Sequence, residues 1–448
     1  MTADNAPAGS ANGPTGPDTW ALTGVTALLG EELTPTRQAT IVITDGRITA
    51  AGHLHDPGPA VPRLHRPDLL VTPGFLNGHT HIGDAAFAEA GFRTEGVDLL
   101  YAPDGQRWQL MARATDEQLV TGMRQAMQTM IRCGVVAFED FREQGRHGVD
   151  LLRQAARGLP IRALALGRHA DLPFTTEQLQ ANTGGLSEEA QAEIRDILDI
   201  ADGFSVVSPN QLTDTALAQT ADLVRAAGKR LAAHVSERDA DRQTSLARTG
   251  RSDIARAIEI LRPDYLVHAT AATPEELRAA ARAGMAIVMC PRSHAGLGFG
   301  VPPYLGAVAA GVNVALGTDN VMTTTPSPHE EANFLVKAER WRTGTVRHPG
   351  PGRLLAAMTV NAAQALGATD LGSLSVGRAA TFVAFDTASP NLAASVANDP
   401  AAALVNRATA GDIAAVVFGG RTVVGTLDRP TLPATRPGPA PAQPYGPS

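Results

Sequence analysis

Eight short apolar runs, separated by stretches with helical periodicity, constrain the fold of this chain more than any other feature. Strands that are buried on both faces of a parallel sheet are almost continuously apolar, and parallel neighbours need a long crossover, usually a helix. The alternation therefore predicts an α/β fold, a (β/α)8 TIM barrel, in which the chemistry lies at the carboxyl ends of the strands. The eight runs are residues 69–81, 134–140, 161–169, 203–210, 230–237, 264–270, 285–294 and 312–320.

The stretches between the runs carry signals for the starts of helices. Thr115 with Gln118, and Thr273 with Glu276, have the spacing of capping boxes, and Pro274 suits the first position of a helix. These signals predict helices after the first and after the sixth apolar run.

Shorter apolar runs with glycine turns lie on both sides of the barrel region. They occupy residues 19–68 and 371–428, and the pair Asp45-Gly46 is typical of a hairpin turn. We expect these two segments to form one small composite β-sandwich domain, with the barrel of residues 69–370 inserted between them. Residues 1–18 and 429–448 are rich in glycine and proline, respectively, and are predicted to be disordered tails.

The composition excludes several classes of protein. The 448 residues include 38 basic and 45 acidic ones, a net charge of −7, and only 4% are aromatic, so a nucleic-acid partner is not expected. Two cysteines do not form a disulfide framework, no apolar run is long enough to span a membrane, and no secretory signal is evident at residues 1–18. We therefore expect a cytoplasmic protein without a membrane partner.

Histidines and carboxylates gather at the carboxyl ends of the apolar runs. His79 and His81 end the first run and, two residues apart on a strand, point the same way, so both can bind one cation. His234 and Asp319 end the fifth and eighth runs and can complete a site for Zn²⁺ or Fe²⁺ with one position open for water. A single histidine at a strand end is usually structural, but the joint placement of these residues favours a metal site.

The motifs of this chain resemble those of the amidohydrolase superfamily, in its cytosine deaminase and chlorohydrolase-like branch. The resemblance covers about residues 20–428 and depends on the motifs PGFLNGHTH (73–81), HVSE (234–237), LVHAT (266–270), CPRSH (290–294), GVNVALGTDN (311–320) and the distal segment 361–386. It implies a composite sandwich beside a metal-bearing barrel, as the β-like flanks also predict.

The resemblance also implies the roles of the site residues. It makes His79, His81, His234 and Asp319 the metal ligands, with Asp319 also catalytic. It makes Glu237 the proton shuttle and His268 the residue that polarises the group under attack. Relatives with two metals use a lysine or an acid after the fourth strand, and here residues 205–211 contain neither, so one divalent metal, zinc or alternatively iron, is expected.

The implied activity is metal-dependent hydrolytic deamination of a small amino-substituted heterocycle or amidine by a metal-activated hydroxide. Hydrolysis of a cyclic amide C–N bond, or of a C–Cl bond on a triazine-like ring, is the alternative within the superfamily. Glu237 favours deamination, because an amine needs a proton to leave and a chloride does not. A non-catalytic binding protein on the same fold is a further alternative, and members of the family are often homo-oligomers.

Several further residues are candidate contacts for the small-molecule substrate. They are Asp84, Arg142, Arg168, Arg292, His294 and Asn320. His294 stands where the motif of the family commonly has asparagine. The three arginines lie near the predicted barrel mouth and suit an anionic substrate, but each can instead pair with an acid such as Asp140, Glu143 or Asp171.

Overall fold

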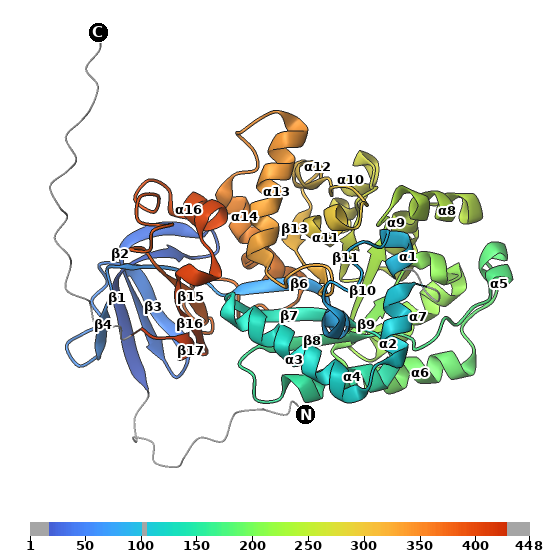
Figure 1. Cartoon of the computed structure of the whole chain (residues 1–448), viewed down its shortest axis with the longest axis horizontal. Helices are drawn as coiled ribbons and strands as arrows, with labels where there is room; N and C mark the ends of the chain where they lie inside the picture. The colour runs from blue at the N-terminus through green and yellow to red at the C-terminus, as the bar shows by residue number, and fades with distance from the viewer. Residues whose placement is uncertain (1–17, 101–104, 428–448) are drawn as a thin grey trace, which may run out of the picture.

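The computed structural model describes residues 18–100 and 105–427, which form a parallel sheet and a second, separate sheet (Figure 1). The predicted tails, residues 1–18 and 429–448, lie outside the described residues except for Asp18. No helix among the described residues is both long and apolar enough to cross a membrane.

The larger sheet contains nine strands, and every pair of neighbours in it is parallel. Each of the eight apolar runs contributes one strand, and the eighth run contributes a second, very short one. Helices cover the outside of this sheet, so the order of elements is that of a TIM-like barrel (Figure 1). The strands are β6 (Phe75–His81), β7 (Val135–Arg142), β8 (Arg162–Gly167), β9 (Gly203–Val206), β10 (Arg230–Val235), β11 (Tyr265–His268), β12 (Ala286–Met289), β13 (Asn313–Leu316) and β14 (Asp319–Asn320).

The eighth apolar run forms two strands instead of one. β13 pairs with β12, whereas β14 pairs with β6, the first strand of the parallel sheet along the chain. Gly317 and Thr318 bridge the two, and their N–H groups donate to Met289 O at 3.0 Å and to His79 O at 3.0 Å. A Cβ atom on Gly317 would lie 2.8 Å from the backbone nitrogen of His79, so this close approach requires glycine. We call residues 317–318 the seam.

Two helices, α3 (Asp116–Arg132) and α10 (Pro274–Arg282), begin where the capping signals predict. Both predicted capping boxes are confirmed, at Thr115 and Thr273. The helical elements up to the sixth barrel strand are η1 (Ile82–Phe87), α1 (Gly96–Leu100), α2 (Gln106–Arg113), α3 (Asp116–Arg132), α4 (Gly145–Ala156), α5 (Thr176–Ala181), α6 (Glu188–Leu198), η2 (Pro209–Gln211), α7 (Asp214–Ala226), α8 (Asp239–Thr249), α9 (Asp253–Arg256) and η3 (Ala257–Leu261). Those that follow are α10 (Pro274–Arg282), α11 (Pro291–Gly296), α12 (Tyr304–Ala309), α13 (Pro328–Thr343), α14 (Pro351–Ala357), α15 (Val360–Ala365), α16 (Pro400–Arg407) and η4 (Ala410–Asp412).

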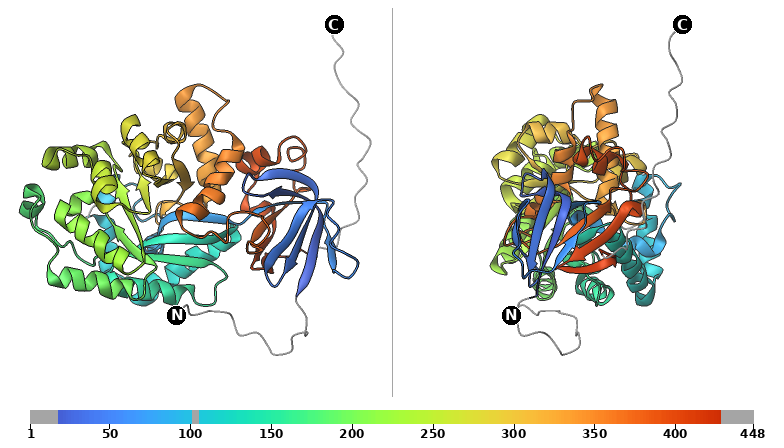
Figure 2. Two further views of the ribbon diagram at one scale, coloured as in Figure 1. Left: turned by 180° about the vertical axis from the view of Figure 1, so that it is seen from behind. Right: turned by 90° about the vertical axis from the view of Figure 1, so that its left-hand side faces the viewer.

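The smaller sheet combines strands from both ends of the described chain, which lie side by side at one end of the molecule (Figure 2). Its pairs are antiparallel except those of β1 with β4 and β5, and it encloses an apolar core of its own. All eight strands belong to one hydrogen-bonded sheet. The strands are β1 (Thr19–Leu29), β2 (Thr34–Thr44), β3 (Arg47–His53), β4 (Arg63–His65), β5 (Leu69–Pro73), β15 (Phe382–Asp386), β16 (Ile413–Phe418) and β17 (Arg421–Gly425).

The first apolar run, residues 69–81, is shared between the two sheets. β5 pairs with β1 and β15 in the smaller sheet, and after Gly74 the chain continues as β6 in the parallel sheet. Every residue of β5 and β6 is buried, so no change of hydrophobic periodicity marks the division. Between β15 and β16 the chain also leaves the smaller sheet, and α16 packs against α14 and α13.

Candidate metal centre and active site

Three histidines and one aspartate converge at the carboxyl ends of β6, β10 and β14. His79 Nε2 lies 3.2 Å from His234 Nε2 and 3.4 Å from an oxygen of Asp319, and His81 Nε2 lies 3.5 Å from the same oxygen. All four side chains are buried. The structure therefore brings together the four side chains that the resemblance assigns as metal ligands.

The spacing of these atoms fits ligands of one metal ion. Neighbouring ligand atoms bound to the same zinc ion at 2.0–2.1 Å are about 3–3.5 Å apart. Two of the three outer nitrogens are also held: His81 Nδ1 is 3.0 Å from Glu143 Oε1, and His234 Nδ1 is 2.9 Å from the carbonyl oxygen of Val207. Acceptors at Nδ1 leave the Nε2 lone pairs of these two rings free for a metal. The Nδ1 of His79 is buried and has no hydrogen-bond partner.

The electrostatics of the four residues suit a cation. Burial lowers the pKa of His81 to about 4, and burial with neighbouring imidazoles holds the pKa of His234 well below its usual value, so both rings are neutral at pH 7. Burial by itself would raise the pKa of Asp319, but its hydrogen bond with His79 and the nearby imidazoles hold that pKa well below its usual value. Ser293 Oγ donates to Asp319 Oδ2 at 2.6 Å.

Glu237 follows β10 and lies beside the metal ligands. Ser236, before it, has a left-handed backbone with φ of +40°, and Asp253 stabilises this turn by accepting from Ser236 N and Ser236 Oγ, each at 2.5 Å. Burial and the charge of Asp319 raise the pKa of Glu237 well above its usual value. The carboxyl group therefore keeps its proton to a higher pH than an exposed glutamate does, which suits a group that gives and takes protons.

His268 ends β11 and completes the cluster. Ligand atoms of Glu237, His268, His294 and Asp319 all lie within 4.8 Å of one another. The ring of His268 stacks on His234, with the ring centroids 4.9 Å apart. His268 and Glu237 thus face the space next to the four converging ligands.

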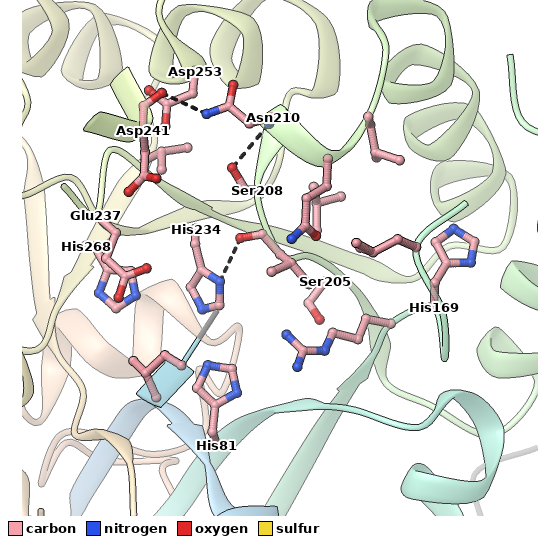
Figure 3. Close-up of a pocket in the computed structure, with 18 of the residues that line it drawn as sticks. His81, His169, Ser205, Ser208, Asn210, His234, Glu237, Asp241, Asp253 and His268 are labelled. Carbon is pink, nitrogen blue, oxygen red and sulfur yellow. Dashed lines mark hydrogen bonds between the residues drawn. The ribbon is translucent and has the colours of Figure 1, made fainter. Parts of the chain in front are cut away.

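A cavity of about 680 Å³ opens onto this cluster (Figure 3). Its wall near the cluster includes His81, His234, Glu237, His268 and Asp319. Its far wall is largely apolar and carries the amide of Asn210 and the ring of His169. The apolar residues of the wall include Trp108, Leu172, Pro173, Phe204, Val206 and Leu212. A volume of this size is typical of a small-molecule site.

Two of the six candidate substrate contacts line the cavity, Arg168 and Asn320. Arg292 lies outside it and binds Glu331 at 2.8 Å, and also pairs with Glu330. His294 is buried behind His268, with 2.8 Å between its Nε2 and His268 Nδ1.

Asp84 and Arg142 also lie outside the cavity wall, in a buried ion cluster beneath His81. Arg107 donates to Asp84 at 2.8 Å, Arg168 donates to Glu143 at 2.9 Å, and Arg107 and Arg142 also pair with Glu143. The bridge from Glu143 to His81 links this cluster to the metal ligands. Asp84 additionally accepts from Asn320 Nδ2 at 2.8 Å.

Sequence reasoning did not identify Arg107, Trp108, Asn77 or Asp253 as parts of the site, and it considered Glu143 only as a partner for an arginine. Arg107, Trp108 and Asp253 occur on helices whose sequences carry no recognisable motif, and their roles depend on contacts across the fold. Asn77 lies within PGFLNGHTH, where its place two residues before His79 on the same strand is a signal that could have identified it.

Comparisons with known proteins agree with this geometry. The amidohydrolase family matches residues 70–423 of the chain. A putative aminohydrolase from Methanothermobacter thermautotrophicus is 30% identical over 398 residues, which cover 89% of this chain and 97% of that protein. A 5-methylthioadenosine/S-adenosylhomocysteine deaminase from Moorella thermoacetica is 26% identical, with coverage of 82% and 84%.

Solved structures share the fold. An adenosine deaminase from Xanthomonas campestris with bound zinc has a TM-score of 0.78 at 20% identity, covering 92% of this chain and 94% of that one. An atrazine chlorohydrolase from Arthrobacter aurescens TC1 in complex with zinc also has a TM-score of 0.78, at 18% identity, with coverage of 92% and 96%. The chain therefore belongs to the amidohydrolase family and is a hydrolase that acts on carbon–nitrogen bonds.

Proposed function

We propose that the protein is a metal-dependent aminohydrolase that replaces the amino group of a nitrogen heterocycle with a carbonyl oxygen and releases ammonia. The observation that carries the proposal is the position of Glu237, a half-buried carboxyl group with a raised pKa, next to the proposed ligand Asp319 and on the same cavity wall as His81 and His234. A carboxyl group with a raised pKa suits the protonation of an amine leaving group. The deaminase names of the relatives support the same reaction.

The metal of this proposal is a single zinc ion held by His79, His81, His234 and Asp319. The nitrogen-rich donor set and the spacing of 3.2–3.5 Å between ligand atoms support zinc. The end of β9, where relatives with two metals carry a lysine or an acid, has Val207 and Ser208 instead. When bound, the metal supplies an activated water at neutral pH.

The residues around the metal ligands move the protons. An oxygen of Asp319 accepts a proton from the attacking water, and His268 stabilises the oxygen as it adds to the ring carbon. Glu237 protonates a ring nitrogen, takes the hydroxyl proton of the adduct and passes it to the amine, so that the carbon–nitrogen bond breaks, a carbonyl forms and ammonia leaves. The proton held by Asp319 then returns to Glu237, so both carboxyl groups regain their starting states.

The cavity indicates the size of the substrate. A volume of about 680 Å³, with an apolar wall of Trp108, Leu172 and Phe204 away from the cluster, exceeds the need of a bare aminopyrimidine. We propose a substrate in which the heterocycle carries an apolar or sugar substituent, as in an adenosine-type nucleoside. Arg168 and Asn320 are the proposed polar contacts on the wall, and Arg168 suits a ring acceptor or an anionic group.

We also propose how the strands of the two sheets divide the chain into a barrel and a smaller domain. We propose that β13 and β14 are the two halves of one barrel strand, so that the parallel sheet is a closed (β/α)8 barrel. Strands β1 to β5 together with β15 to β17 would then form the composite domain. The pairing of β14 with β6 and the short seam between β13 and β14 support this description.

A substrate screen with a matched pair of variants tests the proposed reaction. Zinc-loaded protein is expected to release ammonia from at least one aminopurine, aminopurine nucleoside or aminopyrimidine. Glu237→Gln is expected to keep stoichiometric zinc and to lose about 100- to 10,000-fold in kcat, because the proton shuttle is gone. Glu275→Gln, an exposed glutamate on α10, serves as the control and should match the wild type. An unchanged rate in Glu237→Gln would refute the role of Glu237.

A further inference from the structure

A short hydrogen-bonded chain runs from His268 through His294, on α11, to Thr270 in the loop after β11. His268 Nδ1 is 2.8 Å from His294 Nε2, and His294 Nδ1 is 2.8 Å from Thr270 Oγ1. His294 has no exposed surface. It stands where the strand-seven motif of the family commonly has asparagine.

The backbone holds the members of the chain in place. His268 and Ala269 both have left-handed conformations, with φ of +73° and +51°, which is costly for residues other than glycine. This turn brings Thr270 back towards His294. On the other side, the His294 N–H donates to the carbonyl oxygen of Cys290 at 3.2 Å, which fixes the start of α11.

Two arrangements of protons satisfy this chain. In the inward arrangement, Thr270 donates to His294 Nδ1, His294 Nε2–H donates to His268 Nδ1, and His268 carries its proton on Nε2. In the outward arrangement every bond is reversed, so His268 carries its proton on Nδ1 and presents a bare Nε2 lone pair. Both rings are neutral in either case, because each carries a single proton.

The groups on the cavity side of His268 select between the two arrangements. A carboxylate oxygen of Asp319 lies within 4.8 Å of a ring nitrogen of His268, and an ionised carboxylate only accepts hydrogen bonds. A bare nitrogen lone pair facing Asp319 is repelled, whereas an N–H is attracted. We propose that His294, itself oriented by Thr270, is a positioning residue that holds His268 as the Nε2–H tautomer and directs that proton into the cavity.

The consequence for the reaction rests on the proposed function. In the Nε2–H tautomer, His268 can donate a hydrogen bond to the oxygen that develops negative charge during attack on the ring carbon. In the other tautomer, the ring has no donor on the cavity side and can only accept a hydrogen bond or bind a metal. His294 therefore helps to hold His268 in the tautomer that can act as an electrophilic group.

The tautomer can be measured without any substrate. In zinc-loaded protein labelled with ¹⁵N-histidine, ¹H–¹⁵N correlation spectra are expected to show His268 protonated on Nε2 and His294 also protonated on Nε2. The signals are assigned by their loss in His268→Gln and His294→Gln. Protonation of His268 on Nδ1 in the wild type would overturn the proposal, whatever the activity of the enzyme.

Three variants separate positioning from packing. His294→Leu removes the hydrogen-bond donor to His268 and keeps a side chain of similar volume. It should lower kcat about 10- to 100-fold with little change in KM, because loss of the hydrogen-bond partner of a site residue typically lowers activity by this factor. His294→Gln keeps a donor and should recover most of that loss. Thr270 is less buried than His294. Thr270→Val should shift His268 partly towards the Nδ1–H form and lower kcat by a smaller factor than His294→Leu does.

The outcomes are distinguishable from failure of the proposed function. One outcome is that no substrate releases ammonia, while His268 carries its proton on Nε2 in the wild type but not in His294→Leu. In that case the positioning role stands and the proposed reaction fails. If His294→Leu keeps the wild-type tautomer, or if His294→Gln is as impaired as His294→Leu with zinc content intact, the positioning role fails.

Discussion

Arg168 is the residue whose surroundings most directly suggest a contact with substrate. Its guanidinium lies over the ring of Trp108, 5.2 Å from the ring centroid, and donates to Glu143, whereas its buried Nε makes no hydrogen bond. We expect Arg168→Met to raise KM about tenfold or more with a smaller effect on kcat, because it removes a polar contact of about 1.5–3 kcal/mol. Steady-state kinetics on the substrate found by the screen measure both constants.

The control for this prediction is Arg146→Met, since Arg146 is half-exposed on α4 and pairs with Asp196 away from the cavity. Arg168 also neutralises Glu143, so Arg168→Met should lower the melting temperature as well. A variant with a lower melting temperature but an unchanged KM would mean that Arg168 only supports the ion cluster and does not contact the substrate.

At the scale of elements, the seam between β13 and β14 depends on one side chain of β6. Asn77 is fully buried, its Nδ2 donates to Thr318 Oγ1 at 2.7 Å, and its Oδ1 accepts from Thr318 N at 3.0 Å. The seam places Asp319, with φ of +62°, opposite the histidines. Asn77→Ala is expected to destabilise the protein by about 1–3 kcal/mol and to weaken zinc binding, because it removes both side-chain hydrogen bonds to Thr318 and leaves the buried Thr318 hydroxyl without its hydrogen-bond donor on β6.

Urea denaturation of the metal-free protein and competition with a zinc chelator measure these two effects separately. Asn313→Ala is the matched control, since Asn313 lies on β13 and makes a single hydrogen bond of 3.3 Å to the Asn361 carbonyl oxygen. If Asn77→Ala binds zinc as tightly as the control Asn313→Ala, Asn77 has no role in placing Asp319.

At the scale of the whole molecule, a bound metal joins strands that are far apart in sequence. His79, His234 and Asp319 come from three strands of the parallel sheet, so the unfolded chain cannot present this site. A ligand present at 100 times its Kd stabilises the folded state by about 2.7 kcal/mol. We expect dialysis against a chelator to lower the melting temperature by several degrees, measured by calorimetry, and added zinc to restore it.

The variant His79→Ala should melt at the same temperature with and without zinc, because it lacks a ligand. A wild-type protein whose melting temperature does not respond to chelation and readdition of zinc would contradict a metal site at these residues.

The apolar runs, capping boxes and polar strand ends were sufficient to predict the strands of the parallel sheet and the residues that converge at their carboxyl ends. These features are local or periodic, because the side-chain pattern of a buried strand is set by burial on both faces. The positions of His79, His81, His234 and Asp319 follow from that pattern once the strand ends meet at one edge.

The partners of those residues depend on contacts that no local pattern encodes. The sequence placed Arg142 and Arg168 at the same mouth, but only the fold shows that both pair with Glu143 and that Arg168 alone of the two reaches the cavity. The division of residues 69–81 between two sheets is hidden because both halves are fully buried. The sequence by itself therefore determined the strand framework and the candidate ligands. The tertiary structure decided which charged side chains are neutralised within the protein, because ion pairing depends on distances between segments that are remote in the chain.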